Sequence, residues 1–157
     1  MKKLLFGAAV ALLLLPAAAA QAETINARAI LGGGEETPAL LTGAVGVADL
    51  TIDTDARSIA VEIRMFNIPS ATTAGHIHVG PKGVAGPVVV NFPIPRDRVG
   101  DLNLSFTVNS SNLSPNPAIG INTMDDVIQA IVGGGAYVNV HTAVFPAGEI
   151  RGQIALR

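Results

Sequence analysis

The chain has 157 residues, with 10 basic and 12 acidic side chains, a formal net charge of −2 and no cysteine. Without cysteine, disulfides, thiol catalysis and thiolate ligation of metals are excluded. Basic residues form no cluster beyond the N-terminus, so neither nucleic acid nor anionic membrane surfaces are expected partners.

The N-terminus has the three regions of a secretory signal peptide. Lys2 and Lys3 precede an apolar run over residues 4–15, and small residues continue to Ala22. This run is shorter than the roughly 20 residues of a membrane-spanning helix, which makes a retained anchor the weaker interpretation. We expect a signal peptide at residues 1–22, cleavage after Ala22, and one domain over residues 23–157. The product should be soluble, secreted or periplasmic, and free of the membrane.

Most of the remaining sequence alternates apolar and polar residues with period two, which predicts β-strands. The first strands are expected at 25–31, 43–53 and 59–65. In the second, the apolar parity changes between Val47 and Leu50, and a β-bulge near Ala48 would explain the change. Later strands are expected at 75–80, 87–92, 101–108, 136–144 and 148–156.

One segment, residues 123–132, predicts a short helix instead. Thr123 can cap its N-terminus, Asp125 and Asp126 suit the positive end of the helix dipole, and Gly133 can end it. Seven or eight strands with a single helix predict an all-β Greek-key sandwich or flattened barrel. A closed lipocalin-type barrel is the structural alternative.

All three histidines lie in strand-like segments. His76 and His78 flank Ile77, and His141 follows an alternating run that starts at Tyr137. Side chains at i and i+2 leave a strand on the same side, about 7 Å apart at the backbone, so two imidazoles can converge on one ion. Because the apolar residues between them should face the core, we expect the three histidines on an outer face.

If the two strands are neighbours, His76, His78 and His141 form a three-imidazole metal site with an open position. Imidazole suits copper, zinc, nickel and iron, and the order of affinities favours Cu(II), so copper is the preferred cofactor. The alternative is that these histidines are surface or half-buried residues with ordinary hydrogen bonds.

Three further residues are candidate neighbours of this site: Asn139, Glu149 and Arg151. Glu149 and Arg151 share a strand face, where they can orient a ligating ring or attract an anion. The alternative is a cross-strand ion pair on the surface. The acidic pair at residues 35–36 is interpreted as loop solvation.

Several segments together carry a family resemblance. Residues 74–80 (AGHIHVG), 86–90 (GPVVV), 137–142 (YVNVHT) and 146–154 (PAGEIRGQI) resemble the CHRD (chordin-type) domain family, and residues 31–38 and 43–53 also fit. The family includes bacterial exported proteins and the animal protein chordin. The resemblance implies an immunoglobulin-like β-sandwich and leaves the biochemical role undefined.

The segment His76-Ile77-His78 also resembles the His-Val-His strand of copper-zinc superoxide dismutases, which are Greek-key barrels with copper outside the barrel. This weaker resemblance implies a superoxide-dismutase-like sandwich, with His76 and His78 as copper ligands and His141 in place of a later one. The chain departs from that pattern, since it has no fourth histidine, no zinc-loop ligands and no cysteines.

Three functions follow from these observations. The first is an exported CHRD-domain binding protein whose partner is a metal ion, with copper favoured. The second is an extracellular adhesion or matrix module that binds protein or polysaccharide without metal. The third is a copper-dependent superoxide dismutase-like oxidoreductase. Binding is favoured over catalysis, because the chain has no nucleophile elbow, phosphate-cradling loop or His-Glu-x-x-His helix.

Overall fold

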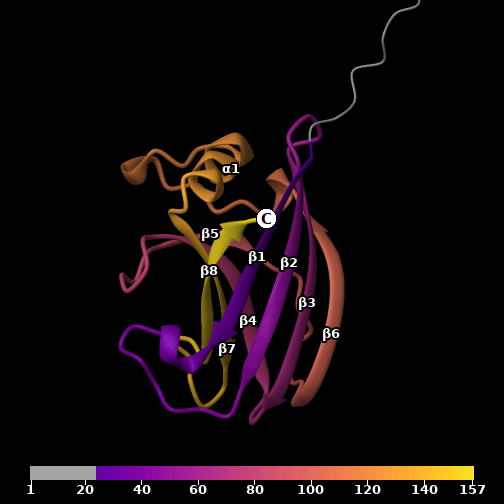
Figure 1. The fold of residues 1–157 in the computed structure, drawn as a ribbon, viewed down its shortest axis with the longest axis vertical. Helices are drawn as coiled ribbons and strands as arrows, with labels where there is room; N and C mark the ends of the chain where they lie inside the picture. The colour runs from indigo at the N-terminus through magenta and orange to yellow at the C-terminus, as the bar shows by residue number, and fades with distance from the viewer. Residues whose placement is uncertain (1–23) are drawn as a thin grey trace, which may run out of the picture.

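The computed structural model describes residues 24–157, and the signal peptide predicted at residues 1–22 lies outside them. Within this range the chain forms eight strands, one α-helix and three 3-10 turns (Figure 1). The strands are β1 Thr24–Gly32, β2 Val45–Asp53, β3 Ser58–Ile68, β4 Thr72–Val79, β5 Val88–Asn91, β6 Gly100–Val108, β7 Ala136–Thr142 and β8 Ile150–Leu156. The helices are η1 Gly33–Glu35, η2 Ser110–Asn112, η3 Pro117–Ile119 and α1 Met124–Val132.

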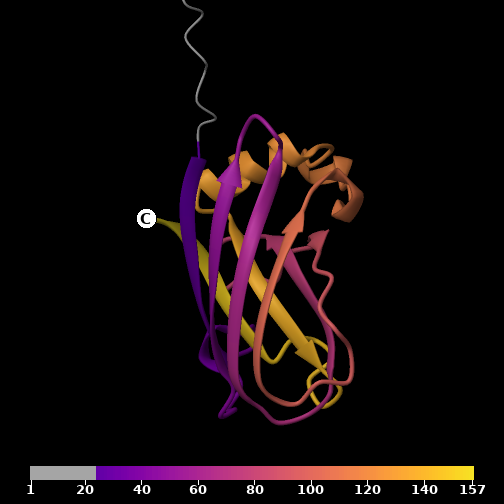
Figure 2. The same cartoon turned by 90° about the vertical axis from the view of Figure 1, so that its right-hand side faces the viewer.

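The strands form one antiparallel sheet in the order β5-β4-β7-β8-β1-β2-β3-β6, which curls into a sandwich (Figures 1 and 2). One half contains β1, β2, β3 and β6, and the other contains β5, β4, β7 and β8. The connections β3–β4, β5–β6 and β6–β7 each cross between the halves, which is Greek-key connectivity. The predicted all-β sandwich with one short helix is confirmed. No ladder joins β5 to β6 in the described sheet, so it is not a closed barrel.

The core lies between the two halves, and period-two alternation places its side chains there. On β3, Ile59, Val61, Ile63 and Met65 are at most 2 % exposed, whereas the residues between them face solvent. Alternate strand residues point to opposite faces, so one apolar stripe per strand fills the interior.

The β-bulge predicted near Ala48 is wrong. The pairing of β2 with β1 and with β3 runs without a register shift from Val45 to Asp53. Gly46 and Ala48 are buried in phase with Leu50 and Ile52. Because these two core positions carry small residues, the apolar side chains of β2 only gave the impression of changing from one face to the other.

The helix α1 closes one end of the sandwich, as Figure 1 shows. Thr123 Oγ1 accepts a hydrogen bond from the Asp126 backbone N–H at 3.3 Å, and the Asp126 carboxylate accepts one from the Thr123 N–H at 2.8 Å. This reciprocal capping box explains why the helix starts where the sequence predicted. Val127 and Ile131 are at most 1 % exposed beneath it. Between residues 24 and 157, α1 and the other helices are too short or too polar to span a membrane.

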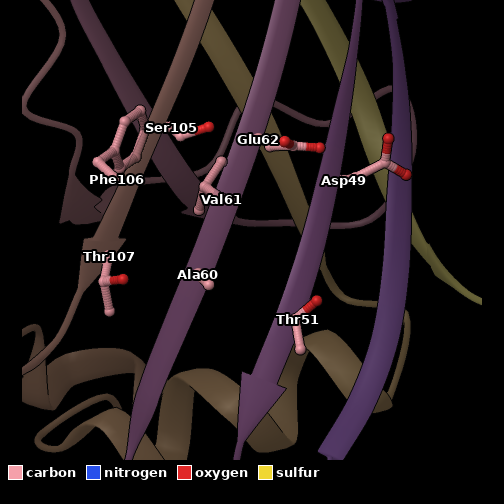
Figure 3. Close-up of a pocket in the computed structure, with 8 residues that line it drawn as sticks. All are labelled: Asp49, Thr51, Ala60, Val61, Glu62, Ser105, Phe106 and Thr107. Carbon is pink, nitrogen blue, oxygen red and sulfur yellow. The ribbon is translucent and has the colours of Figure 1, made fainter.

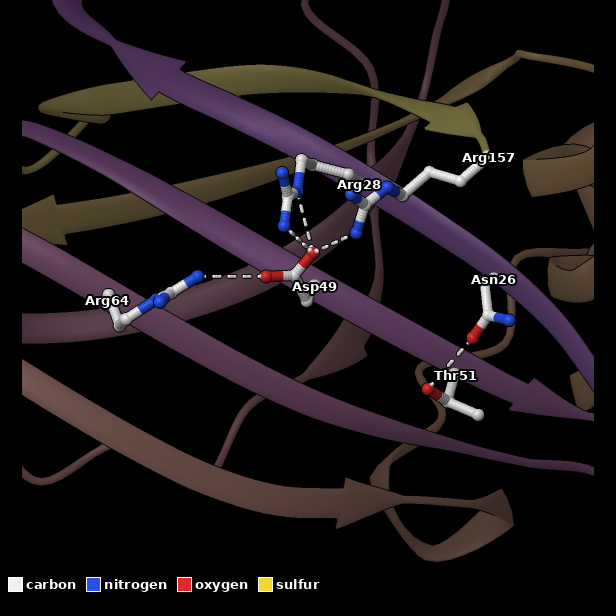
Figure 4. Close-up of polar contacts among 6 residues, drawn as sticks. All are labelled: Asn26, Arg28, Asp49, Thr51, Arg64 and Arg157. Atoms are coloured by element: carbon white, nitrogen blue, oxygen red, sulfur yellow. Dashed lines mark hydrogen bonds and ion pairs between the residues drawn. The ribbon is translucent and has the colours of Figure 1, made fainter.

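The outer face of the β1-β2-β3-β6 half is polar over its centre, and exposed Ile30, Val45 and Phe66 lie towards one end. A shallow hollow on it is lined mainly by hydroxyl and carboxylate side chains, including Thr51, Glu62 and Ser105 (Figure 3). At the margin of this hollow, the Asp49 carboxylate forms ion pairs with Arg28 at 2.6 Å, Arg64 at 3.1 Å and Arg157 at 3.2 Å (Figure 4). The hydrogen bond from Arg28 is the main reason why the pKa of Asp49 is lowered.

Candidate metal centre

The fold brings the three histidines together. His76 and His78 come from β4 and His141 from β7, and these strands are neighbours in the sheet. The backbone register pairs His141 with Ala74 and His76 with Asn139. One ligand nitrogen from each histidine can be chosen so that all three lie within 4.8 Å of one another. The predicted convergence of three imidazoles is therefore present.

The histidines lie on the side of the strands away from the core, as predicted, but two of the three are covered. His78 is 7 % exposed and His141 is 8 % exposed, while His76 is partly exposed. Loop residues 80–87 and 143–148 contact the rings through the carbonyl oxygens of Gly86 and Pro146. The expectation of a solvent-facing site is corrected to a site beneath loops, with access beside His76.

Two carbonyl groups determine which nitrogen of each buried ring carries hydrogen. His78 Nδ1 lies 2.9 Å from Gly86 O, and His141 Nδ1 lies 3.0 Å from Pro146 O. A carbonyl oxygen only accepts, so both Nδ1 atoms donate and both Nε2 atoms keep a lone pair. His141 Nε2 lies 3.0 Å from His76 Nδ1, whereas His78 Nε2 is buried with no partner among the described residues.

All three imidazoles are neutral at pH 7. Burial, and then the neighbouring His141 and His78, lowers the pKa of His76 to about 4. Burial also lowers the pKa of His78 and of His141, although a backbone carbonyl opposes this in each case. The neutral ring is the form that binds a metal ion, so protons compete weakly for this site near neutral pH.

The spacing of the rings suits a metal after a small movement. Metal–nitrogen bonds of about 2.0–2.1 Å in tetrahedral geometry place ligand nitrogens about 3.3 Å apart. The His76–His141 nitrogen pair is already at 3.0 Å, and the spread of the three chosen nitrogens does not exceed 4.8 Å. Three imidazoles leave a fourth position open, which is the usual arrangement of a site that admits water or a small ligand.

The surface ion pair suggested for Glu149 and Arg151 is wrong, because both residues are buried, at 0 % and 2 % exposure. Glu149 accepts hydrogen bonds from Thr42 Oγ1 at 2.5 Å and Thr142 Oγ1 at 2.6 Å. It therefore ties the loop after η1 to the end of β7.

Arg151 holds the covering loop at residues 80–87. Its guanidinium donates to Pro81 O at 3.2 Å and Val84 O at 3.0 Å, and it lies 3.5 Å from the centre of the Tyr137 ring. Asn139, the third predicted neighbour, is 4 % exposed and lies between His76 and Arg151 in the sheet. Its Oδ1 is buried without a partner among the described residues.

Two residues of the site, Tyr137 and Glu36, were not among the candidates predicted from the sequence. The Tyr137 ring stacks on His78, with centroids 4.8 Å apart and an interplanar angle of 11°, and its hydroxyl accepts from the Gly86 N–H at 2.9 Å. Tyr137, Asn139 and His141 are alternate residues of one strand, and this spacing could have placed Tyr137 on the same face as the histidine.

Glu36 is the second missed residue. Burial raises its pKa to about 7, although Arg151 and Asn139 favour the ionised form. Glu36 Oε1 has no partner among the described residues. The interpretation as loop solvation suits only Glu35, which pairs with Lys82 at the surface. No pattern distinguished the two adjacent glutamates.

Comparison with known proteins identifies the family. The sequence model of the CHRD domain matches residues 27–154, a range that contains the whole candidate site. The chain therefore belongs to the CHRD domain family, as its segments predicted. Neither the curated proteins nor the solved structures gave a match.

Proposed function

We propose that this CHRD-domain chain is an exported binding protein that holds one copper ion between His76, His78 and His141. The observation that carries the proposal is the convergence of three neutral imidazoles, one of which has a buried ring nitrogen without a partner among residues 24–157. A buried unpaired acceptor costs about 1–3 kcal/mol, and a metal ion would remove that cost. The signal-peptide pattern at residues 1–22 supports export.

The chemistry of the donors favours copper. The site offers nitrogen alone, because the chain has no cysteine, and the described methionines, Met65 and Met124, are at most 3 % exposed in the core. Among first-row divalent metals, Cu(II) has the highest affinity for such a site. When bound, copper supplies a Lewis acid and a redox centre.

The residues around the site would retain the ion. The carbonyls of Gly86 and Pro146 hold two rings in the required tautomer, and carbonyl partners of this kind make ligating imidazoles more basic. Arg151 holds the loop that covers His78, through Pro81 and Val84. Burial of this kind slows exchange with solvent, which suits storage, delivery or structural stabilisation.

A copper-dependent dismutase is a second candidate, favoured by the partial exposure of His76, which leaves an approach for a small oxidant. The absence of a fourth histidine opposes a copper-zinc site. Superoxide turnover by copper-loaded protein, abolished in His78→Ala, would promote this candidate. An adhesion role without metal is supported by the hollow on the open outer face of the β1-β2-β3-β6 half (Figure 3).

The test uses residues 23–157 without a histidine tag, stripped of metal, loaded with one equivalent of Cu(II) and desalted. We expect one copper per chain, with quenching of tyrosine fluorescence, because Tyr137 is the sole tyrosine, stacks on His78, and has no tryptophan to mask it. His78→Ala and His141→Ala should each weaken binding at least about tenfold.

The matched control is Asn91→Ala, since Asn91 is the β5 neighbour of His76 but offers no imidazole. It should load like the wild type, and circular dichroism would establish that all variants are folded. Substoichiometric copper in the wild type, or equal loading in the histidine variants, would reject the metal site.

A further inference from the structure

The strand β6 has one open edge. It ends the strand order and pairs only with β3, at the right-hand margin of the sandwich in Figure 1. In an antiparallel pair, alternate residues direct N–H and C=O groups away from the partner strand. Among residues 24–157, no other segment gives a backbone hydrogen bond to residues 100–108. The outer row of backbone groups of β6 is therefore available for another strand.

This edge lacks the usual protection against pairing. Natural sheets guard their edges with lysine, proline, bulges or short strands. β6 is nine residues long, contains no Lys, Arg or Pro, and has one charged residue, Asp101, near its start. Its pairing with β3 is regular from Leu102 to Val108. The opposite edge strand, β5, has four residues and a register shift against β4.

The core-facing side of β6 is incompletely covered. Leu102, Leu104 and Phe106 are only partly buried, whereas the β3 residues opposite them are at most 2 % exposed. A further strand along β6 would cover this apolar stripe. Its own side chains would have to be apolar at the same alternate positions.

We propose that the strand is the β6 of a second copy of this chain, paired antiparallel about Leu104. In this register Leu104 faces Leu104, Leu102 faces Phe106 and Asn103 faces Ser105 across the two-fold axis. Apolar residues meet on one side and polar residues on the other. Asp101 of each copy faces Thr107, so no like charges oppose each other. A two-fold interface requires this kind of self-complementarity, and the register uses the whole strand.

The test introduces charges of opposite sign at Thr107, which is exposed and lies opposite the uncharged Ala60 within its own chain. Thr107→Lys places two new Lys–Asp101 pairs in the dimer, and Thr107→Asp places two like-charge pairs there. Cross-strand pairs contribute roughly 0.2–1 kcal/mol each, so the dissociation constant should change by about 2- to 30-fold, downward for Lys and upward for Asp. Sedimentation velocity at low salt measures it.

The matched control is the same pair of substitutions at Thr51, which lies in the same cross-strand row on the central strand β2. These variants should leave the dissociation constant unchanged. The experiment is run with and without copper, because the interface is independent of the histidines. A wild type that stays monomeric up to millimolar concentration overturns the proposal. Equal effects of Lys and Asp at Thr107 also overturn it.

Discussion

The half-buried carboxyl of Glu36 makes this domain less stable as the pH rises towards neutrality. Its pKa rises from 4.5 to about 7 in the folded chain, chiefly because of burial. The folded state therefore binds an extra proton between these values, and stability is fully present below pH 4.5 and declines as the pH rises through 7. At 1.36 kcal/mol per unit the ceiling is about 3 kcal/mol, which partial exposure reduces to about 1–2 kcal/mol.

The variant Glu36→Gln has nearly the same shape and no charge, so it should lose this decline. We expect it to match the wild type at pH 5 and to exceed it at pH 8 by about 1–2 kcal/mol, or about 3–10 °C in Tm. Urea unfolding at both pH values is the assay. Glu35→Gln, at the exposed neighbouring position, should show no such pH-dependent gain. A Glu36→Gln variant that is less stable at pH 8, or has the wild-type pH slope, would show that ionisation of Glu36 does not destabilise the fold.

Three further outcomes are expected. Because the pKa of His76 is lowered to about 4, the metal-free protein should lose about 1–2 kcal/mol as the pH falls from 6.5 towards 4; urea unfolding of His76→Gln should show a smaller loss. Asp49→Asn, which leaves three guanidiniums without their carboxylate, should cost about 1 kcal/mol at low salt and less at high salt. A Cβ on Gly86 would meet Val79 O at 1.8 Å. Gly86→Ala should therefore lower Tm, and it should weaken copper binding because it displaces the carbonyl partner of His78. The control Gly34→Ala has open space around the added Cβ and should be nearly neutral in both assays.

Most of the fold could be predicted because it follows local rules. Alternation marks each strand whose core side is large and apolar, as in β3, and the capping box at Thr123 marks the start of α1. The rule failed at Gly46 and Ala48, which are small residues at core positions. A Cβ on Gly46 would meet Arg64 O at 2.9 Å and Leu31 Cδ1 at 3.3 Å. Composition there follows the available space, which depends on neighbouring strands.

Side-chain parity could place the three histidines on one outer face, but their convergence was predicted only on the condition that the two strands are neighbours, which the pairing of β4 with β7 meets. Their burial could not be predicted, since it depends on loops 80–87 and 143–148 folding back over the sheet. For the same reason Glu149 and Arg151 looked like surface charges. Loop contacts such as Arg151 with Val84 join residues far apart in the sequence, and no local pattern encodes them.

X-ray absorption at the copper edge tests most directly whether the three imidazoles bind one copper ion. Protein loaded with one equivalent should show three imidazole nitrogens at about 2.0 Å, and His141→Ala should show two. A wild-type spectrum with one imidazole or none, or a spectrum unchanged in His141→Ala, would rule out the three-histidine copper site.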